Sequence, residues 1–127
     1  MHKKIILALI MITTLMIWMI SCTKQSANKI DGSNNACDTT NVKYSVGVVP
    51  ILQASCYGCH GNGNSGGSGG IVLEGYSNLS AWAHNGYLVG NVTHANGYVP
   101  MPYDAPMLPA CEVNTIVAWV NQGALNN

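Results

Sequence analysis

Apolar and polar positions divide this chain of 127 residues into three parts. Residues 5–20 are apolar except for Thr13 and Thr14, and residues 23–36 contain few apolar side chains. From residue 44 onward, short apolar segments alternate with stretches rich in glycine or proline. The pattern predicts a leader, a flexible tether and one small helical domain.

Two short helices are predicted in the first half of the domain. The first covers residues 44–56, and its regular part begins near Pro50, because proline cannot sit deep inside a helix. The second covers residues 77–86, and residues 86–98 are predicted to form turns because they contain several glycines. The inward side chains of the second helix are Leu79, Trp82 and Ala83.

The clearest helix is the last one. Pro109 suits its first turn, Glu112 suits the positive end of the helix dipole, and Gly123 suits its end. Apolar side chains at helical spacing form a stripe on one face, and Trp119 lies beside that stripe. The stripe consists of Val113, Ile116, Val117 and Val120.

The leader has the features of a secretory signal. Residues 1–4 form a short basic segment, and the apolar run of residues 5–20 follows it directly. As a helix this run spans about 24 Å, which is less than the roughly 30 Å hydrocarbon core of a bilayer. An uncleaved membrane anchor is the alternative, and both arrangements export the domain and tether it to a membrane.

The end of the leader resembles the cleavage region of bacterial lipoproteins, in which a cysteine becomes the lipidated first residue. Ser21 and Cys22 suit that pattern, whereas Met19 stands where leucine is usual. We therefore expect a signal peptide at residues 1–21, lipid on Cys22 and a tether over residues 22–36. The expected location is a membrane surface facing the periplasm or the cell exterior.

Charge argues against one class of partner. From Cys22 onward the chain has three lysines, no arginine and five carboxylates, a net charge of −2. Because nucleic-acid-binding surfaces carry basic patches, nucleic acid is not an expected partner. Residues 37–127 suffice for a single small domain, whose own core stabilises it only marginally.

Five consecutive residues, Cys56-Tyr57-Gly58-Cys59-His60, carry the chemistry. C-x-x-C-H is the attachment signature of a c-type haem, in which both thiols form thioether bonds and the histidine is the proximal iron ligand. A bare C-x-x-C also occurs in zinc sites and redox dithiols. Zinc needs a second close pair of ligands, and a redox dithiol does not need His60. One covalently attached haem c is therefore the predicted cofactor.

Two further cysteines, Cys37 and Cys111, enclose most of the domain. In an exported protein such a pair most often forms a disulfide, which for this loop length contributes about 4 kcal/mol by the chain-entropy estimate. Two buried free thiols are the alternative. The predicted bridge ties the start of the domain to its last helix.

A second axial ligand has four candidates in the domain. Met101 is flanked by Pro100 and Pro102, which stiffen the backbone around a weak thioether ligand. Met107, His84 and His94 are the other candidates. Ordinary packing suits Met107, and exposed surface positions suit the two histidines.

The order of these features resembles class I cytochromes c, and is especially similar to single-haem domains of bacterial lipoproteins. The resemblance covers residues 44–124 and rests on Cys56–His60, the glycine-rich loop, Met101-Pro102 and a helix with Trp119. It implies an all-α fold with helices wrapped around one haem, and it implies Met101 as the distal iron ligand. The loop after His60 is longer and richer in glycine than in that family.

The expected function is electron transfer between redox protein partners outside the cytoplasm, without enzymatic activity. The alternative is a haem-based ligand-binding or sensor domain with an open or displaceable distal site. Three tyrosines are candidates for packing around the haem, although ordinary partial burial explains them equally well. They are Tyr57, Tyr98 and Tyr103.

Overall fold

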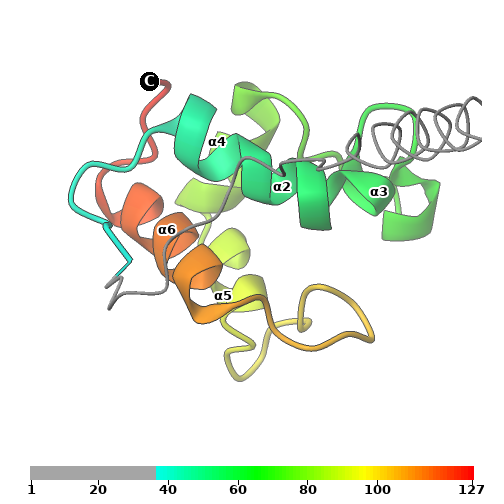
Figure 1. Cartoon of the computed structure of the whole chain (residues 1–127). Helices are drawn as coiled ribbons and strands as arrows, with labels where there is room; N and C mark the ends of the chain where they lie inside the picture. The colour runs from blue at the N-terminus through cyan, green and yellow to red at the C-terminus, as the bar shows by residue number, and fades with distance from the viewer. Residues whose placement is uncertain (1–36) are drawn as a thin grey trace, which may run out of the picture. The chain divides into compact units, whose positions relative to one another are not determined.

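A computed structural model describes residues 37–127 (Figure 1). These residues form helices and connecting loops without a strand, so the predicted all-α class is confirmed at that level. The predicted signal peptide, the lipidation of Cys22 and the tether over residues 22–36 lie outside the described residues. No helix within residues 37–127 is both long and apolar enough to cross a membrane.

Seven helical elements follow one another along the described residues. The predicted first helix consists of a π-helical turn followed by an α-helix with proline in its first turn, as Pro50 requires. The predicted second and last helices are present within a few residues of their expected bounds. The elements are η1 (Tyr44–Val48), α2 (Val49–Ser55), α3 (Tyr57–His60), η2 (Ser65–Ser68), α4 (Tyr76–His84), α5 (Tyr87–Val92) and α6 (Ala110–Asn121).

The prediction of turns over residues 86–98 was wrong for residues 87–92, which form α5, whereas turns do follow from Thr93 onward. Gly86 precedes this helix in the left-handed conformation, with φ of 82°. Gly90 lies inside the helix because the ring of Tyr98 packs directly on it. A Cβ atom at Gly90 would lie 2.3 Å from that ring. Tertiary packing therefore requires a glycine that the sequence pattern associates with turns.

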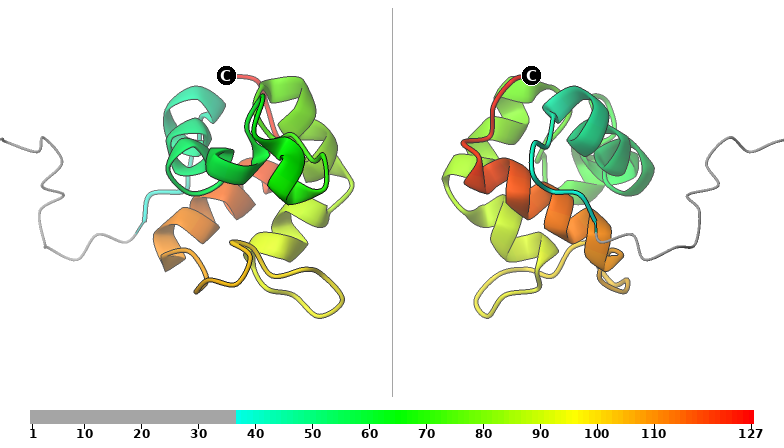
Figure 2. Two further views of the ribbon diagram at one scale, coloured as in Figure 1. Left: turned by 90° about the vertical axis from the view of Figure 1, so that its right-hand side faces the viewer. Right: turned by 60° about the vertical axis from the view of Figure 1, so that its left-hand side comes forward.

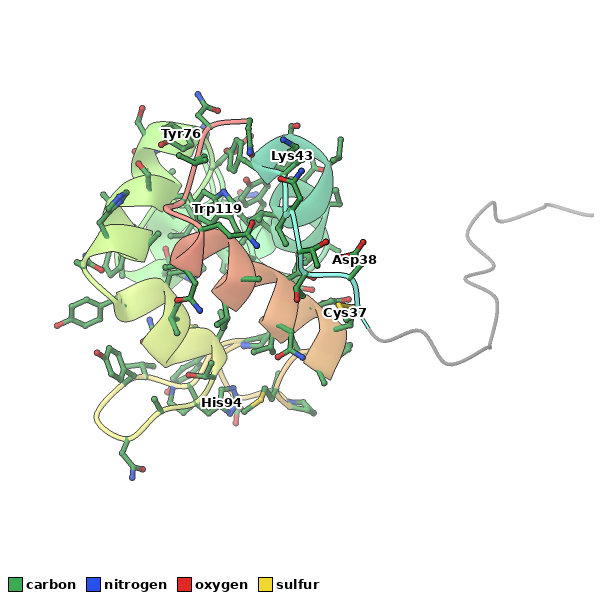
Figure 3. All side chains as sticks on the ribbon, turned by 90° about the vertical axis from the view of Figure 1, so that its left-hand side faces the viewer. Cys37, Asp38, Lys43, Tyr76, His94 and Trp119 are labelled. Atoms are coloured by element: carbon green, nitrogen blue, oxygen red, sulfur yellow. A yellow bond between two sulfur atoms is a disulfide. The ribbon has the colours of Figure 1, made fainter. Side chains whose placement is uncertain are left out.

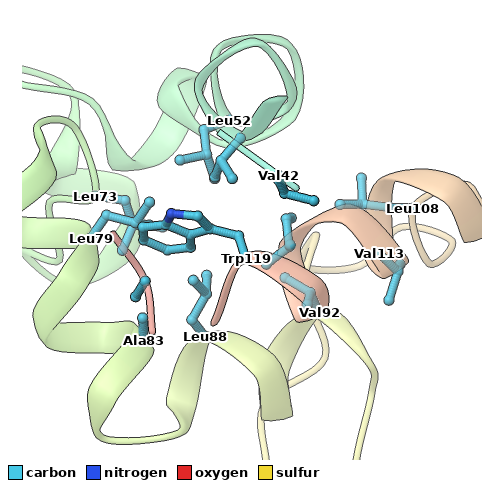
Figure 4. Close-up of a cluster of buried hydrophobic side chains, with 13 residues drawn as sticks. Val42, Leu52, Leu73, Leu79, Ala83, Leu88, Val92, Leu108, Val113 and Trp119 are labelled. Carbon is cyan, nitrogen blue, oxygen red and sulfur yellow. The ribbon is translucent and has the colours of Figure 1, made fainter. Parts of the chain in front are cut away.

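The centre of the core is Trp119, which is fully buried (Figure 4). Its indole N–H donates to the carbonyl oxygen of Leu125 at 2.9 Å, so the polar atom of the ring is satisfied. The sequence placed Trp119 beside the apolar stripe of α6, but the structure places it among the most buried residues, and Val117 and Val120 are only partly buried. The buried set is Val42, Val48, Leu52, Leu73, Leu79, Ala83, Leu88, Val92, Leu108, Val113, Ile116, Trp119 and Ala124.

The start of the domain is joined to α6 and to the C-terminal residues. The sulfur atoms of Cys37 and Cys111 lie 2.03 Å apart, a disulfide distance, as the sequence predicted (Figure 3). Farther along, the N–H of Tyr44 donates to Asn127 Oδ1 at 2.8 Å, and Gln122 Oε1 accepts from the N–H of Val42 at 3.0 Å. These contacts fix the first residues of the domain against its last helix and the residues that follow it.

Candidate functional site

The C-x-x-C-H residues form one helical turn. Cys56 immediately precedes α3, and its carbonyl oxygen accepts from the N–H of Cys59 at 3.1 Å and of His60 at 2.8 Å. Both cysteines are free thiols, so they are joined neither to each other nor to another cysteine of the described domain. The turn therefore presents two thiols and one imidazole from five consecutive residues.

The two thiols have different surroundings. Cys56 is partly buried and packs against the hydrophobic core, whereas Cys59 is exposed. Burial, with a smaller contribution from the negative charge of Glu112, raises the pKa of the Cys56 thiol to about 11. Cys56 is therefore almost entirely protonated at neutral pH. Burial likewise raises the pKa of Tyr57, between the two cysteines, to about 12.

The ring of His60 is oriented by a backbone carbonyl. His60 Nδ1 lies 3.0 Å from the carbonyl oxygen of Ile71, and because a carbonyl oxygen only accepts, Nδ1 carries the proton of this hydrogen bond. The other ring nitrogen, Nε2, is then the one with a lone pair for a metal. Nothing in the sequence indicates that Ile71 supplies this carbonyl.

The proximal loop, residues 61–74, returns the chain to His60. The N–H of Leu73 donates to the carbonyl oxygen of His60 at 2.8 Å, and Glu74 Oε2 accepts from the N–H of Asn62 at 2.7 Å. Gly61 starts the loop where a Cβ atom would lie only 2.6 Å from the carbonyl oxygen of Tyr57. The glycine-rich sequence therefore closes on itself and places the Ile71 carbonyl beside the imidazole.

Met101 lies in the distal segment, residues 95–107, which connects α5 to the approach to α6. Its backbone is held on both sides: its N–H donates to the carbonyl oxygen of Asn91 at 3.0 Å, and its carbonyl oxygen accepts from His94 Nε2 at 3.1 Å. Figure 3 shows His94 beside this segment. Asn91 Oδ1, in α5, is buried and has no hydrogen-bond partner within the described residues.

The proximal and distal residues lie on one side of the domain. In Figures 1 and 2, α3 with the proximal loop and the distal segment both extend from the side of the domain that faces the viewer in the left panel of Figure 2. The two elements come from residues about forty positions apart in the sequence, and α6 packs behind them against η1 and α5.

The other predicted ligand candidates have different surroundings. His84 is exposed on α4, and its Nδ1 donates to the carbonyl oxygen of Ser80 at 2.6 Å. Met107 is 45% exposed near the start of α6, and the ring of His94 is engaged with Met101. Of the two methionines, Met101 is the one whose backbone is bound by α5 and the residues directly after it.

The donor set of α3 fits a covalently attached haem: two unpaired thiols at the required spacing, and a histidine whose Nδ1 is already bound. Within residues 37–127, no three His, Cys, Asp or Glu side chains are grouped closely enough to hold a metal ion by themselves. No family model, curated protein or solved structure matches this chain. The case for a function therefore depends on the chemistry of the site.

Proposed function

We propose that this chain is a membrane-tethered monohaem c-type cytochrome that carries electrons between redox partners outside the cytoplasm. The observation that carries the proposal is the turn of Cys56, Cys59 and His60, with both thiols free and the imidazole already oriented by the Ile71 carbonyl. Preorganised ligand geometry of this kind is typical of metal-binding histidines. In this proposal the helices of residues 37–127 surround one haem, as in class I cytochromes c.

Each residue of the site has a distinct role in the proposal. The thiols of Cys56 and Cys59 would anchor the haem covalently, and Nε2 of His60 and the thioether of Met101 would bind its iron. A haem held there supplies an iron centre that changes between ferrous and ferric states. The protein residues keep their positions during electron transfer, so the site needs neither a proton donor nor a substrate pocket.

A redox-active dithiol is disfavoured by the surroundings of Cys56. The attacking cysteine of such a pair usually has a lowered pKa, because the thiolate is the nucleophile. Burial instead raises the pKa of Cys56 to about 11. The position of Cys56 beside the core suits attachment of an apolar group.

Two carboxylates of the domain take part in local structure. Glu74 accepts the N–H of Asn62 and thereby closes the proximal loop, and Asp38 accepts from the N–H and the hydroxyl of Thr40. Hydrogen bonding to Thr40 lowers the pKa of Asp38, as expected for a carboxylate that stays ionised. These roles support a carrier without acid–base catalysis.

The proposed location follows from the leader and from the disulfide. Disulfides persist in oxidising compartments, so the pairing of Cys37 with Cys111 is consistent with export. Lipid on Cys22 would then hold the domain at a membrane that faces the periplasm or the cell exterior. The partners in this proposal are redox proteins that donate and accept the electron, and nucleic acid is not among them.

Optical spectroscopy of the purified full chain tests the proposal. A closed site with His60 and Met101 as axial ligands gives a low-spin ferric spectrum with a methionine-to-iron charge-transfer band, and the ferrous form binds carbon monoxide slowly. A high-spin ferric spectrum, or rapid carbon monoxide binding by the native ferrous form, would contradict the carrier. That outcome would favour a ligand-binding or sensor domain with an open distal site.

A further inference from the structure

The carbonyl that orients His60 has a second donor beside it. Ser68 Oγ lies 2.8 Å from the carbonyl oxygen of Ile71, and His60 Nδ1 lies 3.0 Å from the same atom. Ser68 is partly buried at the end of η2, within the proximal loop. A carbonyl oxygen has two lone pairs, so it can accept from the imidazole and from the hydroxyl together.

The hydroxyl of Ser68 has one proton and two carbonyl oxygens within reach. Besides Ile71, the carbonyl oxygen of Ser65 lies 2.8 Å from Ser68 Oγ. That oxygen already accepts from the backbone N–H groups of Gly69 and Gly70, which occupy both of its lone pairs. The Ile71 oxygen accepts from His60 alone, so the hydroxyl proton is directed to Ile71.

We propose that Ser68 is a positioning residue that tunes His60 through the carbonyl of Ile71. The inference rests on the proposed function, because its consequence concerns the iron that His60 would hold. Two donors on one oxygen each receive a weaker hydrogen bond than one donor alone. The hydroxyl of Ser68 therefore weakens the hydrogen bond from His60 Nδ1 to the Ile71 carbonyl. The imidazole then carries less negative charge. A less negative imidazole stabilises ferric iron less, which raises the reduction potential.

The Ile71 carbonyl is also held in position by contacts that do not involve the Ser68 hydroxyl. The hydrogen bond from Leu73 to the His60 carbonyl and that from Asn62 to Glu74 hold the proximal loop closed on either side of η2. Removal of the hydroxyl therefore leaves the acceptor in place with His60 as its single donor. Without the hydroxyl, the hydrogen bond from His60 to the Ile71 carbonyl is expected to strengthen. The reduction potential of the iron is then expected to fall.

Potentiometric titration of the haem-bearing full chain tests this inference. In Ser68→Ala the equilibrium constant for reduction is expected to fall about threefold, the effect of a modest change in one hydrogen bond. For a one-electron couple this is about 28 mV. Ser68→Thr keeps a hydroxyl and is expected to have the wild-type reduction potential. Ser65→Ala removes a hydroxyl from the same loop but keeps the Ser65 carbonyl, so it is expected to leave the potential unchanged.

A second readout follows the imidazole itself. In the ferrous form, the NMR signal of the His60 Nδ1 proton is expected to move downfield in Ser68→Ala, since its hydrogen bond strengthens. An unchanged or higher potential in Ser68→Ala, or a shift equal to that of Ser65→Ala, overturns the inference while the haem-bearing wild type upholds the proposed function. A wild-type chain that carries no haem overturns both.

Discussion

The proximal loop and the distal segment hold their proposed ligands in different ways. In the proximal loop the side chain of His60 is fixed directly, because the Ile71 carbonyl accepts from its ring. In the distal segment the backbone of Met101 is fixed at its N–H and at its carbonyl oxygen. The orientation of the imidazole is therefore set by the folded chain, whereas the thioether of Met101 follows the position of its backbone.

The two regions also differ in how much of them is buried. The proximal loop includes the buried Leu73, whereas in the distal segment Val99 is 51% exposed and Tyr103 is 76% exposed. Segments with few buried apolar contacts open at a lower free energy than the core. In the proposed site Met101 would therefore be the more easily displaced ligand, and His60 would stay in place if the distal side opened.

The largest effect is expected from loss of the proximal ligand. His60→Ala removes a residue of the attachment signature, so haem content in the purified protein should fall about tenfold or more. The measurement is haem absorbance per chain after denaturation. His84→Ala is the matched control, because His84 is exposed on α4 and should leave haem content unchanged. Equal haem content in both variants would show that His60 does not take part in haem attachment.

Loss of the distal ligand should leave the haem attached. In Met101→Ala the ferric charge-transfer band is expected to disappear and carbon monoxide to bind the ferrous form rapidly, with haem content unchanged. Optical spectra and stopped-flow mixing provide both measurements. Met107→Ala, which changes another methionine of the same segment, should keep the band. If the band is lost in Met107→Ala instead, the distal ligand has been assigned to the wrong residue.

The disulfide is expected to stabilise the distal side more than the proximal side, because Cys111 lies in the first turn of α6, directly after the distal segment. The double variant Cys37→Ser/Cys111→Ser should lower the free energy of unfolding by about 4 kcal/mol in urea titrations. In hydrogen exchange, the amide of Met101 should lose more protection than that of Leu73. Equal losses at both amides would show that the disulfide does not distinguish the two regions.

The smallest effect is expected at His94. His94 has a left-handed backbone with φ of 51°, so His94→Asn removes the ring while keeping a residue that tolerates this conformation. Loss of one neutral hydrogen bond to Met101 should increase the population with Met101 detached about fivefold. The charge-transfer band followed against temperature measures this population. A melting curve identical to that of His84→Ala would contradict a role for His94 in holding the segment.

Sequence pattern predicted the helices whose apolar spacing is regular. The last helix was placed by Pro109, Glu112 and Gly123, and the structure begins it at Ala110. Helix α5 was missed because several glycines in residues 86–98 are typical of turns, whereas Gly90 lies in the helix and leaves room for the ring of Tyr98. Trp119 was predicted to lie beside the stripe, because the spacing of apolar residues does not show which of them is most deeply buried.

The site was predictable to the extent that its chemistry is contiguous. Cys56, Cys59 and His60 share one turn, so their spacing alone indicated a common ligand. The partner of His60 is Ile71, eleven positions away across a glycine-rich loop without periodicity, and it acts through its backbone. A backbone carbonyl carries no signature in the sequence, so neither Ile71 nor the hydroxyl of Ser68 beside it was foreseeable.

Mass spectrometry of the purified full chain tests the central claim most directly. After proteolysis, the peptide that contains Cys56-Tyr57-Gly58-Cys59-His60 should carry the mass of one haem bound through both cysteines, with no thiol left to alkylate. The same peptide recovered without haem, with both thiols free for alkylation or joined to each other, would contradict the account.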